Sequence, residues 1–467
     1  MRLKSGLSMR FAAATVTENK MGRVMTKWAK QSAADLGRGI GAGQIDPVAL
    51  TQHFLDAIQS HPMADRIYAR VTPDRALAEA NAASERAILG RRLSPLDGVP
   101  VSWKDLFDTA GVETEAGSAL LKGRMPVSDA AVLKTASAMG LVCLGKTHMS
   151  ELAFSGLGLN PVTATSPCVN DLEAVAGGSS SGAATSVAFG LAAAAVGSDT
   201  GGSVRIPSAW NDLVGLKTTS GRLSLQGVVP LAAKFDTVGP LCRTVEDAAM
   251  MLAALEGRAG PDLRGAYGLK GRRFGALQTI VMEDLSPEVA AAYDESLARL
   301  RAAGAEIVPI EVPELARSIA DAGVLYTSEA WATWGVEIAA QPDLMFAPIR
   351  ERFEAGQATK ASDYVRAWQD LEKLRAIWAT ATASLDAVLC PTAPNLPPKT
   401  DKLMEQGQYY VTANLLTLRN TRVGNLTGGC GITLPTGVPS CGLLLTAGPM
   451  QEDRLLRLAK AVETALA

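Results

Sequence analysis

Residues 174–210, which read AVAGGSSSGAATSVAFGLAAAAVGSDTGGSVRIPSAW, place serines in two glycine-rich segments, GGSSSG and DTGGS. The first segment precedes a predicted helix and the second follows a predicted strand. Such turns expose backbone N–H groups, and glycines let a ligand approach the main chain closely. The N–H groups of Thr200, Gly201, Gly202 and Ser203 are therefore candidates to surround a developing oxyanion.

A hydrolytic serine needs a base, and the chain has only three histidines. His53 and His61 lie in and at the end of an amphipathic helical stretch, where solvated or capping roles are expected. His148 follows a predicted strand, but no G-x-S-x-G elbow accompanies it. Lys104 ends the β-prone run GVPVSWK, and a lysine there can act as a base once burial lowers its pKa from ~10.4 to roughly 7–8.

Between about residues 95 and 260, short apolar runs alternate with alanine-rich helical stretches, which is typical of a mostly parallel sheet covered by helices. Residues 285–380 are charged and helix-rich, and strand signals return in DAVLCPTAP, GITLPTG and VPSCGLLLTAG. No linker, repeat or low-complexity tract divides the chain. We therefore expect a single domain over 25–467, with its catalytic core at about 95–260 and a helix-rich insertion at about 285–380.

The N-terminal part is expected to begin with a loose extension over 1–24, upstream of Met25 as a candidate natural start. A helix, a glycine-rich turn at 37–43 and a second helix capped by Asp46 are predicted to follow. The turn matches G-x-G-x-x-A, but no strand precedes it. This favours a helix–loop–helix joint over a dinucleotide site.

The composition excludes several classes of partner. Forty-five Lys and Arg against 47 Asp and Glu leave a formal charge of −2, so we expect neither nucleic acid nor an acidic membrane as a partner. The longest apolar stretch, 187–197, is shorter than the ~20 residues that span a bilayer. The six cysteines form no C-x-x-C pair. They predict buried thiols in a reducing, cytoplasmic compartment and no metal site.

Around the lysine and the serines the chain resembles the amidase signature family. The matching text is DGVPVSWKDLF, GLVCLGKTHMSELAFSGLGLNP, the stretch from GGSSSG to GRLS, and DAVLCPTAPNLPP. The resemblance runs from about residue 30 to the C-terminus. It implies an α/β amidase-signature fold, in which a large mixed, mostly parallel β-sheet is sandwiched between helices.

The resemblance also implies roles for individual residues. Ser203 corresponds to the nucleophile, and Ser179, whose peptide bond is cis in the family, relays the proton of Ser203 to neutral Lys104. Supporting roles are implied for Ser180, as a hydrogen-bond partner of Lys104, and for Asp199 with Arg205, as a brace on the nucleophile turn.

The substrate pocket is less well specified by the sequence. Phe154, in ELAFSGLGLNP, corresponds to a segment that lines the acyl pocket in relatives. Ile206 and Trp210 lie where the chain departs from the family pattern, and they either reshape the pocket wall or belong to the packing. Arg419 and Arg422 could meet an acidic substrate, but we expect surface arginines.

These observations predict an amidase that hydrolyses a carboxamide, or a related amide or urea C–N bond, through an acyl-serine intermediate without a cofactor or metal. Its expected partner is a small-molecule amide. One alternative is the A subunit of a glutamine-dependent aminoacyl-tRNA amidotransferase, which is its glutaminase chain. Ile206 counts against this alternative, because that subfamily commonly has a glutamine at this position. A second is a catalytically inactive binding scaffold. Dimers are frequent among relatives, so a homodimer stays open.

Overall fold

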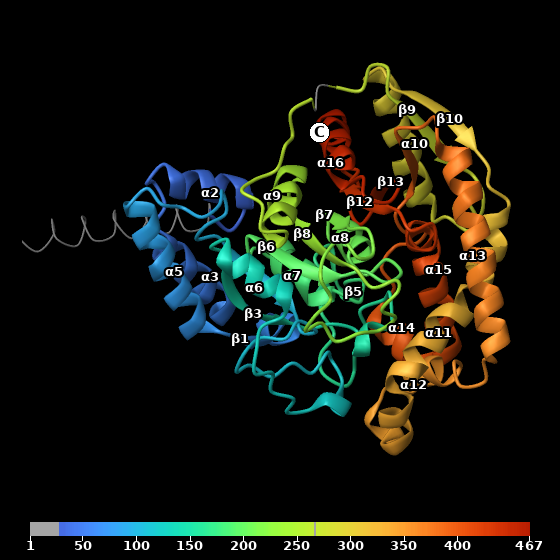
Figure 1. Ribbon diagram of the computed structural model, residues 1–467, viewed down its shortest axis with the longest axis horizontal. Helices are drawn as coiled ribbons and strands as arrows, with labels where there is room; N and C mark the ends of the chain where they lie inside the picture. Colours follow the sequence, from blue (N-terminus) through green and yellow to red (C-terminus); the bar gives the residue numbers. More distant parts are fainter. Residues whose placement is uncertain (1–27, 266–267) are drawn as a thin grey trace, which may run out of the picture.

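The computed structural model describes residues 28–265 and 268–467, so the expected extension at 1–24 lies outside the described residues. An eleven-stranded sheet runs through the molecule in the order β1-β3-β2-β6-β8-β7-β12-β13-β11-β9-β10 (Figure 1). Its strands are β1 (Tyr68–Val71), β2 (Pro100–Lys104), β3 (Val142–Thr147), β6 (Ala194–Ser198), β7 (Val214–Lys217), β8 (Val238–Cys242), β9 (Arg273–Leu277), β10 (Glu306–Ile310), β11 (Ala387–Pro391), β12 (Cys430–Pro435) and β13 (Gly442–Ala447). A separate two-stranded sheet pairs β4 (Pro167–Cys168) with β5 (Asp171–Val175).

The sheet is mixed, as expected, but its pairing corrects one part of the prediction. Parallel pairs join β3 to β2 to β6 on one side and β11 to β9 to β10 on the other. Between them, from β6 through β8, β7, β12 and β13 to β11, each strand pairs antiparallel with the next. Antiparallel pairs therefore outnumber parallel ones in the described residues. The short connection between β12 and β13 explains part of this, because neighbouring strands joined by a tight link must run in opposite directions.

Helices cover both faces of the sheet. The helices of the described residues are α2 (Ala33–Gly41), α3 (Pro47–Ser60), α4 (Ala64–Ile67), α5 (Pro73–Ile88), α6 (Ala131–Ala138), α7 (Ser181–Ala188), α8 (Arg205–Trp210), α9 (Val245–Leu255), α10 (Pro287–Ala302), α11 (Glu314–Ala340), α12 (Ala347–Glu354), α13 (Ala361–Thr382), α14 (Thr400–Glu405), α15 (Gly407–Leu426) and α16 (Glu452–Leu466). Short 3-10 turns occur at Ala119–Leu121, Glu151–Ala153 and Pro342–Leu344.

Strand β6 shows why its sequence is a continuous apolar run. Ala195 packs in a cluster with residues of α7, whereas Ala194 and Val196 belong to the larger core cluster that also contains residues of α9. Successive side chains of a strand point to opposite faces, so a strand covered on both sides has no solvent-facing positions. The small side chains of LAAAAVG suit this doubly buried position.

The predicted joint of two helices at the N-terminus is present, with one difference. Helix α2 continues through Gly41, so the turn begins at Ala42 and not at residue 37. A Cβ on Gly37 would collide with the carbonyl oxygen of Pro95. This glycine therefore serves close packing of the helix rather than a turn. Asp46 caps α3 as predicted, accepting a hydrogen bond from the N–H of Ala49.

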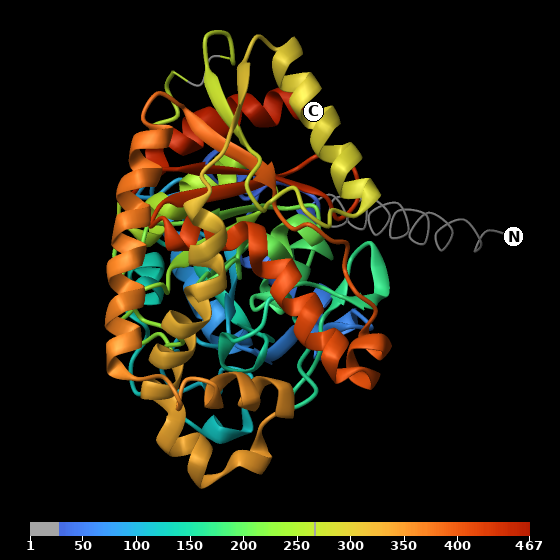
Figure 2. The same cartoon turned by 90° about the vertical axis from the view of Figure 1, so that its right-hand side faces the viewer.

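The segment 285–380 is helix-rich, but it also contributes strand β10 to the sheet. Its helices α11, α12 and α13 lie at the opposite end of the molecule from α2, α3 and α5 (Figure 1). Figure 2 views the molecule from this side, where α11 packs against α13, α12 and α15. Of these helices, α11, α12 and α15 contribute residues to the wall of the hollow described below.

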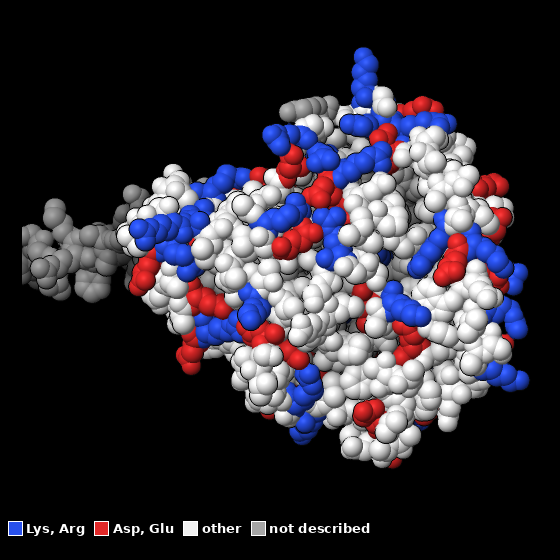
Figure 3. Space-filling model, in the orientation of Figure 1, with Lys and Arg blue, Asp and Glu red and all other residues white. Residues whose placement is uncertain are grey.

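The cysteines and the charged side chains are distributed as the composition predicted. All six cysteines are buried free thiols. Positive and negative side chains are interspersed over the face shown in Figure 3, in keeping with the small net charge. Among the described residues, no helix combines the length and apolar character that crossing a bilayer requires.

Candidate active site

Lys104 is the last residue of β2 and is fully buried. Its Nζ donates hydrogen bonds to Ser179 Oγ at 2.7 Å and to Ser198 Oγ at 2.8 Å. Ser198 is the last residue of β6, which runs parallel to β2. The carboxyl ends of parallel strands meet at one edge of a sheet, where ligands commonly bind. Strand pairing thus places the lysine beside the DTGGS turn.

Burial lowers the pKa of Lys104 to about 7, although the nearby carboxylates of Asp199 and Asp236 act in the opposite direction. Removing an ammonium from water disfavours its charged form. Near neutral pH a large fraction of Lys104 is therefore the neutral amine, the form that can accept a proton.

Ser179 is fully buried, and the peptide bond between Gly178 and Ser179 is cis, as the resemblance implied. The carbonyl of Ser179 accepts a hydrogen bond from the N–H of Ser150 at 3.1 Å, and the N–H of Gly178 donates to Gly156 O at 2.7 Å. A Cβ on Gly178 would collide with Gly158 and Ser150. The ELAFSGLGLNP segment thus packs tightly against the serine loop and fixes its position.

The structure corrects the expected role of Ser180. Its hydroxyl forms no hydrogen bond with Lys104 and instead donates to Ser198 O at 3.2 Å, while its N–H donates to Ser203 O at 3.2 Å. Ser180 therefore ties the loop of Ser179 to the DTGGS turn. The second hydrogen-bond partner of Lys104 is Ser198, which the sequence reasoning missed.

Replacing Ser198 with alanine is expected to lower kcat/KM about tenfold, because Lys104 loses one of the two hydroxyls that orient its amine. The loss of a polar neighbour also disfavours the ammonium, so the pH at which activity rises should move lower. A pH profile of kcat/KM measures both effects.

Ser208→Ala is the matched control, since Ser208 is equally buried and its hydroxyl has no hydrogen-bond partner among the described residues. An unchanged profile in Ser198→Ala would show that Ser198 does not position the lysine.

The DTGGS turn, residues 199–203, is built on glycine. Gly202 has a positive φ of 141°, and a Cβ there would collide with Thr421 and Ile206. Thr421 Oγ1 donates to Gly201 O at 2.7 Å, so helix α15 packs directly on the turn. Ser203, 3% exposed, follows at the start of α8. These contacts hold the main chain that precedes Ser203 in place.

Asp199 and Arg205 form the expected brace. Both are fully buried, and Arg205 donates from Nε and Nη2 to the two oxygens of Asp199, at 2.9 Å each. Although burial opposes its ionisation, the adjacent Arg205 guanidinium holds the pKa of Asp199 well below its usual range. Asn425 Nδ2 also donates to Asp199, at 2.9 Å. The carboxylate is therefore an acceptor around which the turn is organised.

The hydrogen bonds of the turn correct the predicted oxyanion site. The N–H of Gly202 already donates to Asp199 Oδ1 at 2.8 Å, so it is not free for a ligand. Within the described residues, the N–H groups of Thr200, Gly201 and Ser203 have no protein acceptor. These three remain the candidates for an oxyanion.

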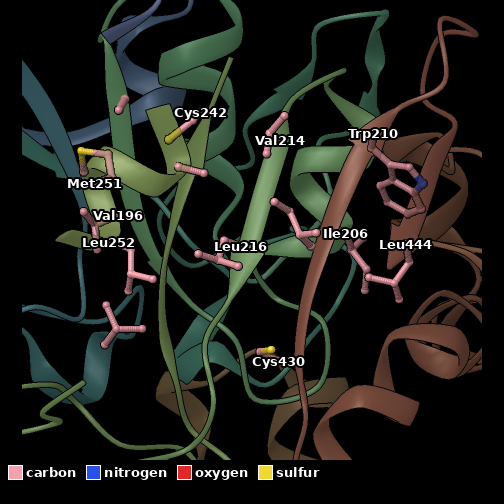
Figure 4. Packing of buried hydrophobic residues seen from close by; sticks show 14 of the residues in the cluster. Val196, Ile206, Trp210, Val214, Leu216, Cys242, Met251, Leu252, Cys430 and Leu444 are labelled. Carbon is pink, nitrogen blue, oxygen red and sulfur yellow. The ribbon is translucent and has the colours of Figure 1, made fainter. Parts of the chain in front are cut away.

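A hollow opens over Ser203. Of the three predicted pocket residues, Phe154 lines it, whereas Ile206 and Trp210 do not. Figure 4 shows Ile206 and Trp210 among the packed side chains of the core, and both are fully buried. Ile206 packs beneath the turn, and Trp210 Nε1 donates to Asn395 O at 3.1 Å. The side chains that complete the hollow are Ala153, Ser155, Leu231, Tyr326, Arg352, Leu418 and Arg422.

The expectation of surface arginines on α15 is wrong. Arg419 and Arg422 are each only 8% exposed. Arg419 donates to Glu283 O and lies 3.9 Å from the carboxylate of Asp284. Arg422 lines the hollow with Ser203. Polar residues on this helix are buried because the helix packs against the polar DTGGS turn.

The histidines lie elsewhere. None of them is among the residues that line the hollow over Ser203. His53 is buried rather than solvated, and His61 caps the C-terminus of α3. Burial lowers the pKa of His148 to about 4. The geometry therefore favours Lys104 over histidine as the base.

The mixed sheet thus carries a buried lysine at the carboxyl end of β2, hydrogen-bonded to a serine loop and close to the glycine-built DTGGS turn. The Amidase family matches residues 49–456, and the chain belongs to this family.

Three comparisons show the range of its relatives. The chain is 36% identical to 2-amino-5-chloromuconic acid deaminase of Comamonas testosteroni, over 86% of this chain and 89% of the relative. It is 33% identical to the A subunit of glutamyl-tRNA(Gln) amidotransferase from Anaeromyxobacter sp. (strain K), over 92% and 95% of the two chains. The structure of peptide amidase from Stenotrophomonas maltophilia superposes with a TM-score of 0.79 at 28% identity, covering 94% of this chain and 97% of that one.

Proposed function

We propose that this amidase-family hydrolase cleaves a carboxamide, or a related amide or urea C–N bond, through a covalent acyl-Ser203 intermediate, with Ser179 and Lys104 as the proton relay. The observation that carries the proposal is the hydrogen bond from buried Lys104 Nζ to Ser179 Oγ, at 2.7 Å. It gives a serine loop beside Ser203 a base that is partly neutral near pH 7.

In the acylation step, Ser203 Oγ attacks the carbonyl carbon. Its proton passes to Ser179 Oγ as Ser179 passes its own proton to Lys104 Nζ. The tetrahedral oxyanion is stabilised by the N–H groups of Thr200, Gly201 and Ser203. The Lys104 ammonium returns a proton through Ser179 to the leaving nitrogen, the C–N bond breaks and the amine departs.

In the deacylation step, water attacks the acyl carbon and gives a proton through Ser179 to Lys104. The ester bond breaks, the acid is released and the proton returns to Ser203 Oγ. Every group that moves a proton belongs to this chain, so the cycle closes without a cofactor.

The glutaminase chain of a tRNA amidotransferase is the second candidate, supported by the 33% identity with such a protein. The buried Ile206 stands where that subfamily commonly has glutamine, which favours a stand-alone hydrolase. The intact contact between Lys104 and Ser179 favours either enzyme over an inactive scaffold. The similarity to 2-amino-5-chloromuconic acid deaminase supports the cleavage of a C–N bond, because a deaminase removes an amino group.

The purified chain, without tRNA, ATP or another protein, is expected to cleave at least one small amide other than glutamine with kcat/KM of about 10³ M⁻¹s⁻¹ or above, an ordinary value for an enzyme. Ammonia or amine release from a panel of primary amides, anilides and ureas measures this. The Ser203→Ala variant is the blank for each substrate. Glutaminase activity that arises only with an added partner protein, together with no turnover of the panel, would establish the amidotransferase role instead.

A further inference from the structure

Two guanidinium groups border the hollow over Ser203. Arg422 comes from α15 and Arg352 from α12, and both line this hollow. The side chain of Arg422 lies against the oxyanion turn, since its Nε is 3.9 Å from the position that a Cβ on Gly201 would occupy. A group bound to Arg422 would therefore lie a few bonds from a carbonyl seated over Ser203.

Helix α15 fixes Arg422 in this place. Leu418, Thr421 and Asn425 occupy the same face of the helix, at three- and four-residue spacing. Leu418 lines the hollow, Thr421 donates to Gly201 O, and Asn425 donates to Asp199. Helix α15 therefore both contacts the DTGGS turn and carries Arg422, so the position of the Arg422 guanidinium is fixed relative to Ser203.

Neither arginine has an acidic partner in the described part of the chain. Arg422 is 8% exposed, and it makes no ion pair or hydrogen bond to another described residue; its guanidinium lies 5.8 Å from the ring centre of Tyr326. Arg352 donates to Phe154 O at 2.9 Å and stacks on the Phe154 ring at 4.2 Å. Burial, and for Arg352 also the neighbouring Arg422, lowers the pKa of both groups.

Two other buried arginines of this chain lie near carboxylates. Arg205 is paired with Asp199, and Arg419 with Asp284 and a carbonyl oxygen. The described residues that line the hollow over Ser203 include no Asp or Glu. A buried cation without a counterion is unfavourable unless a ligand supplies the opposite charge.

We infer that the substrate carries a carboxylate, which Arg422 binds with the help of Arg352, so that the enzyme acts on anionic amides. This inference rests on the proposed function, because it concerns the substrate of the same serine. A guanidinium binds a carboxylate through two parallel hydrogen bonds, which would orient the scissile carbonyl as well as attract the anion.

The body of the substrate is expected to be apolar. Tyr326, Arg352 and Arg422 also line an adjoining hollow of about 630 Å³. Apolar side chains of Ile319, Pro348, Val411, Leu415 and Leu416 line it, together with Glu351. Glu351 is exposed and forms no ion pair with the two arginines. An unsaturated or aromatic carbon skeleton would fit the mainly aliphatic and aromatic wall.

Matched pairs of amides test the inference. Each pair has a carboxylate in one member and a neutral acetyl group of similar shape in the other: 3-carbamoylbenzoate with 3-acetylbenzamide, and glutaramate with 5-oxohexanamide. We expect the wild-type enzyme to prefer the anionic member of at least one pair by roughly tenfold or more in kcat/KM. Arg422→Met should lower kcat/KM for that anion by roughly 30-fold or more and change the neutral member little, so the preference disappears.

Two variants serve as controls. Arg366→Met removes one positive charge from an exposed position on α13 and should keep the wild-type preference. Arg422→Lys keeps the positive charge but loses the planar guanidinium, which binds a carboxylate through two parallel hydrogen bonds. This variant should restore part of the preference for the anionic amide. Labelling of Ser203 by a neutral fluorophosphonate reports whether each variant is folded and has a working nucleophile, and protection against it measures binding of compounds that are not turned over.

The outcomes separate the two proposals. Failure of the fluorophosphonate to label Ser203 in the wild-type enzyme, with no amide turned over, would overturn the proposed function itself. Normal labelling with equal or better use of the neutral members would overturn only the anionic substrate. So would a preference that persists in Arg422→Met, or the absence of both turnover and protection for every anionic compound.

Discussion

Replacing Ser203 with alanine is expected to lower kcat/KM by roughly 10⁴-fold or more for any amide that the wild-type enzyme cleaves, while the melting temperature stays close to wild type. Alanine has no atom that can form the acyl bond, so only binding and the N–H groups of the turn remain to assist water. The turn itself is held by Asp199 and Thr421 and does not depend on the Ser203 hydroxyl. Ammonia release and thermal unfolding measure the two quantities.

Ser181→Ala is the matched control for this change. Ser181 is the third serine of GGSSSG and is equally buried, but its hydroxyl donates a long hydrogen bond of 3.4 Å to His148 O, away from Lys104. Its activity should stay within about threefold of wild type. If Ser203→Ala retained activity within about tenfold, a change of ~1.4 kcal/mol in the barrier, Ser203 could not be the nucleophile.

The sequence predicted Lys104 as the base because this residue ends an apolar run. The place of that run in the sheet determines what surrounds the lysine. Strands β2 and β6 are parallel neighbours, so the ends of GVPVSWK and LAAAAVGS lie together. The same reasoning could have identified Ser198, the last residue of the second run. The family resemblance implied Ser180 instead, which is adjacent in sequence to Ser179 but donates its hydroxyl hydrogen bond to the carbonyl of Ser198.

The sequence could not show which polar residues are buried. The stretch TLRNTRVGN contains mostly polar residues, and polarity on a helix normally indicates exposure. Here the helix packs against a turn that is itself polar, so Thr421, Arg422 and Asn425 are all buried. Strand direction was equally hidden, since an apolar run covered on both faces looks the same whether its neighbours are parallel or antiparallel.

Replacing Lys104 with methionine, which keeps most of the volume, is expected to lower kcat/KM by roughly 10³-fold or more, within the range that a general base contributes. The wild-type enzyme should show kcat/KM rising with pH and levelling off above about 7. The sign follows from the charge: below its pKa, which burial lowers to about 7, Lys104 is an ammonium and cannot accept the proton from Ser179. A pH profile of kcat/KM for the wild-type enzyme and for Lys104→Met measures the rise and its loss in the variant.

Lys217→Met separates the loss of a base from the loss of a buried lysine. Lys217 is also buried, and burial lowers its pKa to about 8, but its Nζ donates to the carbonyls of Thr218 and Gly429, not to a serine hydroxyl. Its replacement should change stability, because two carbonyls lose their donor, yet leave the rise in activity near pH 7. Burial lowers the pKa of His148 to about 4, so this histidine cannot produce that rise. A rise that persists in Lys104→Met would assign the base to another group, and a rise lost in Lys217→Met as well would mean that the profile reports stability rather than proton transfer.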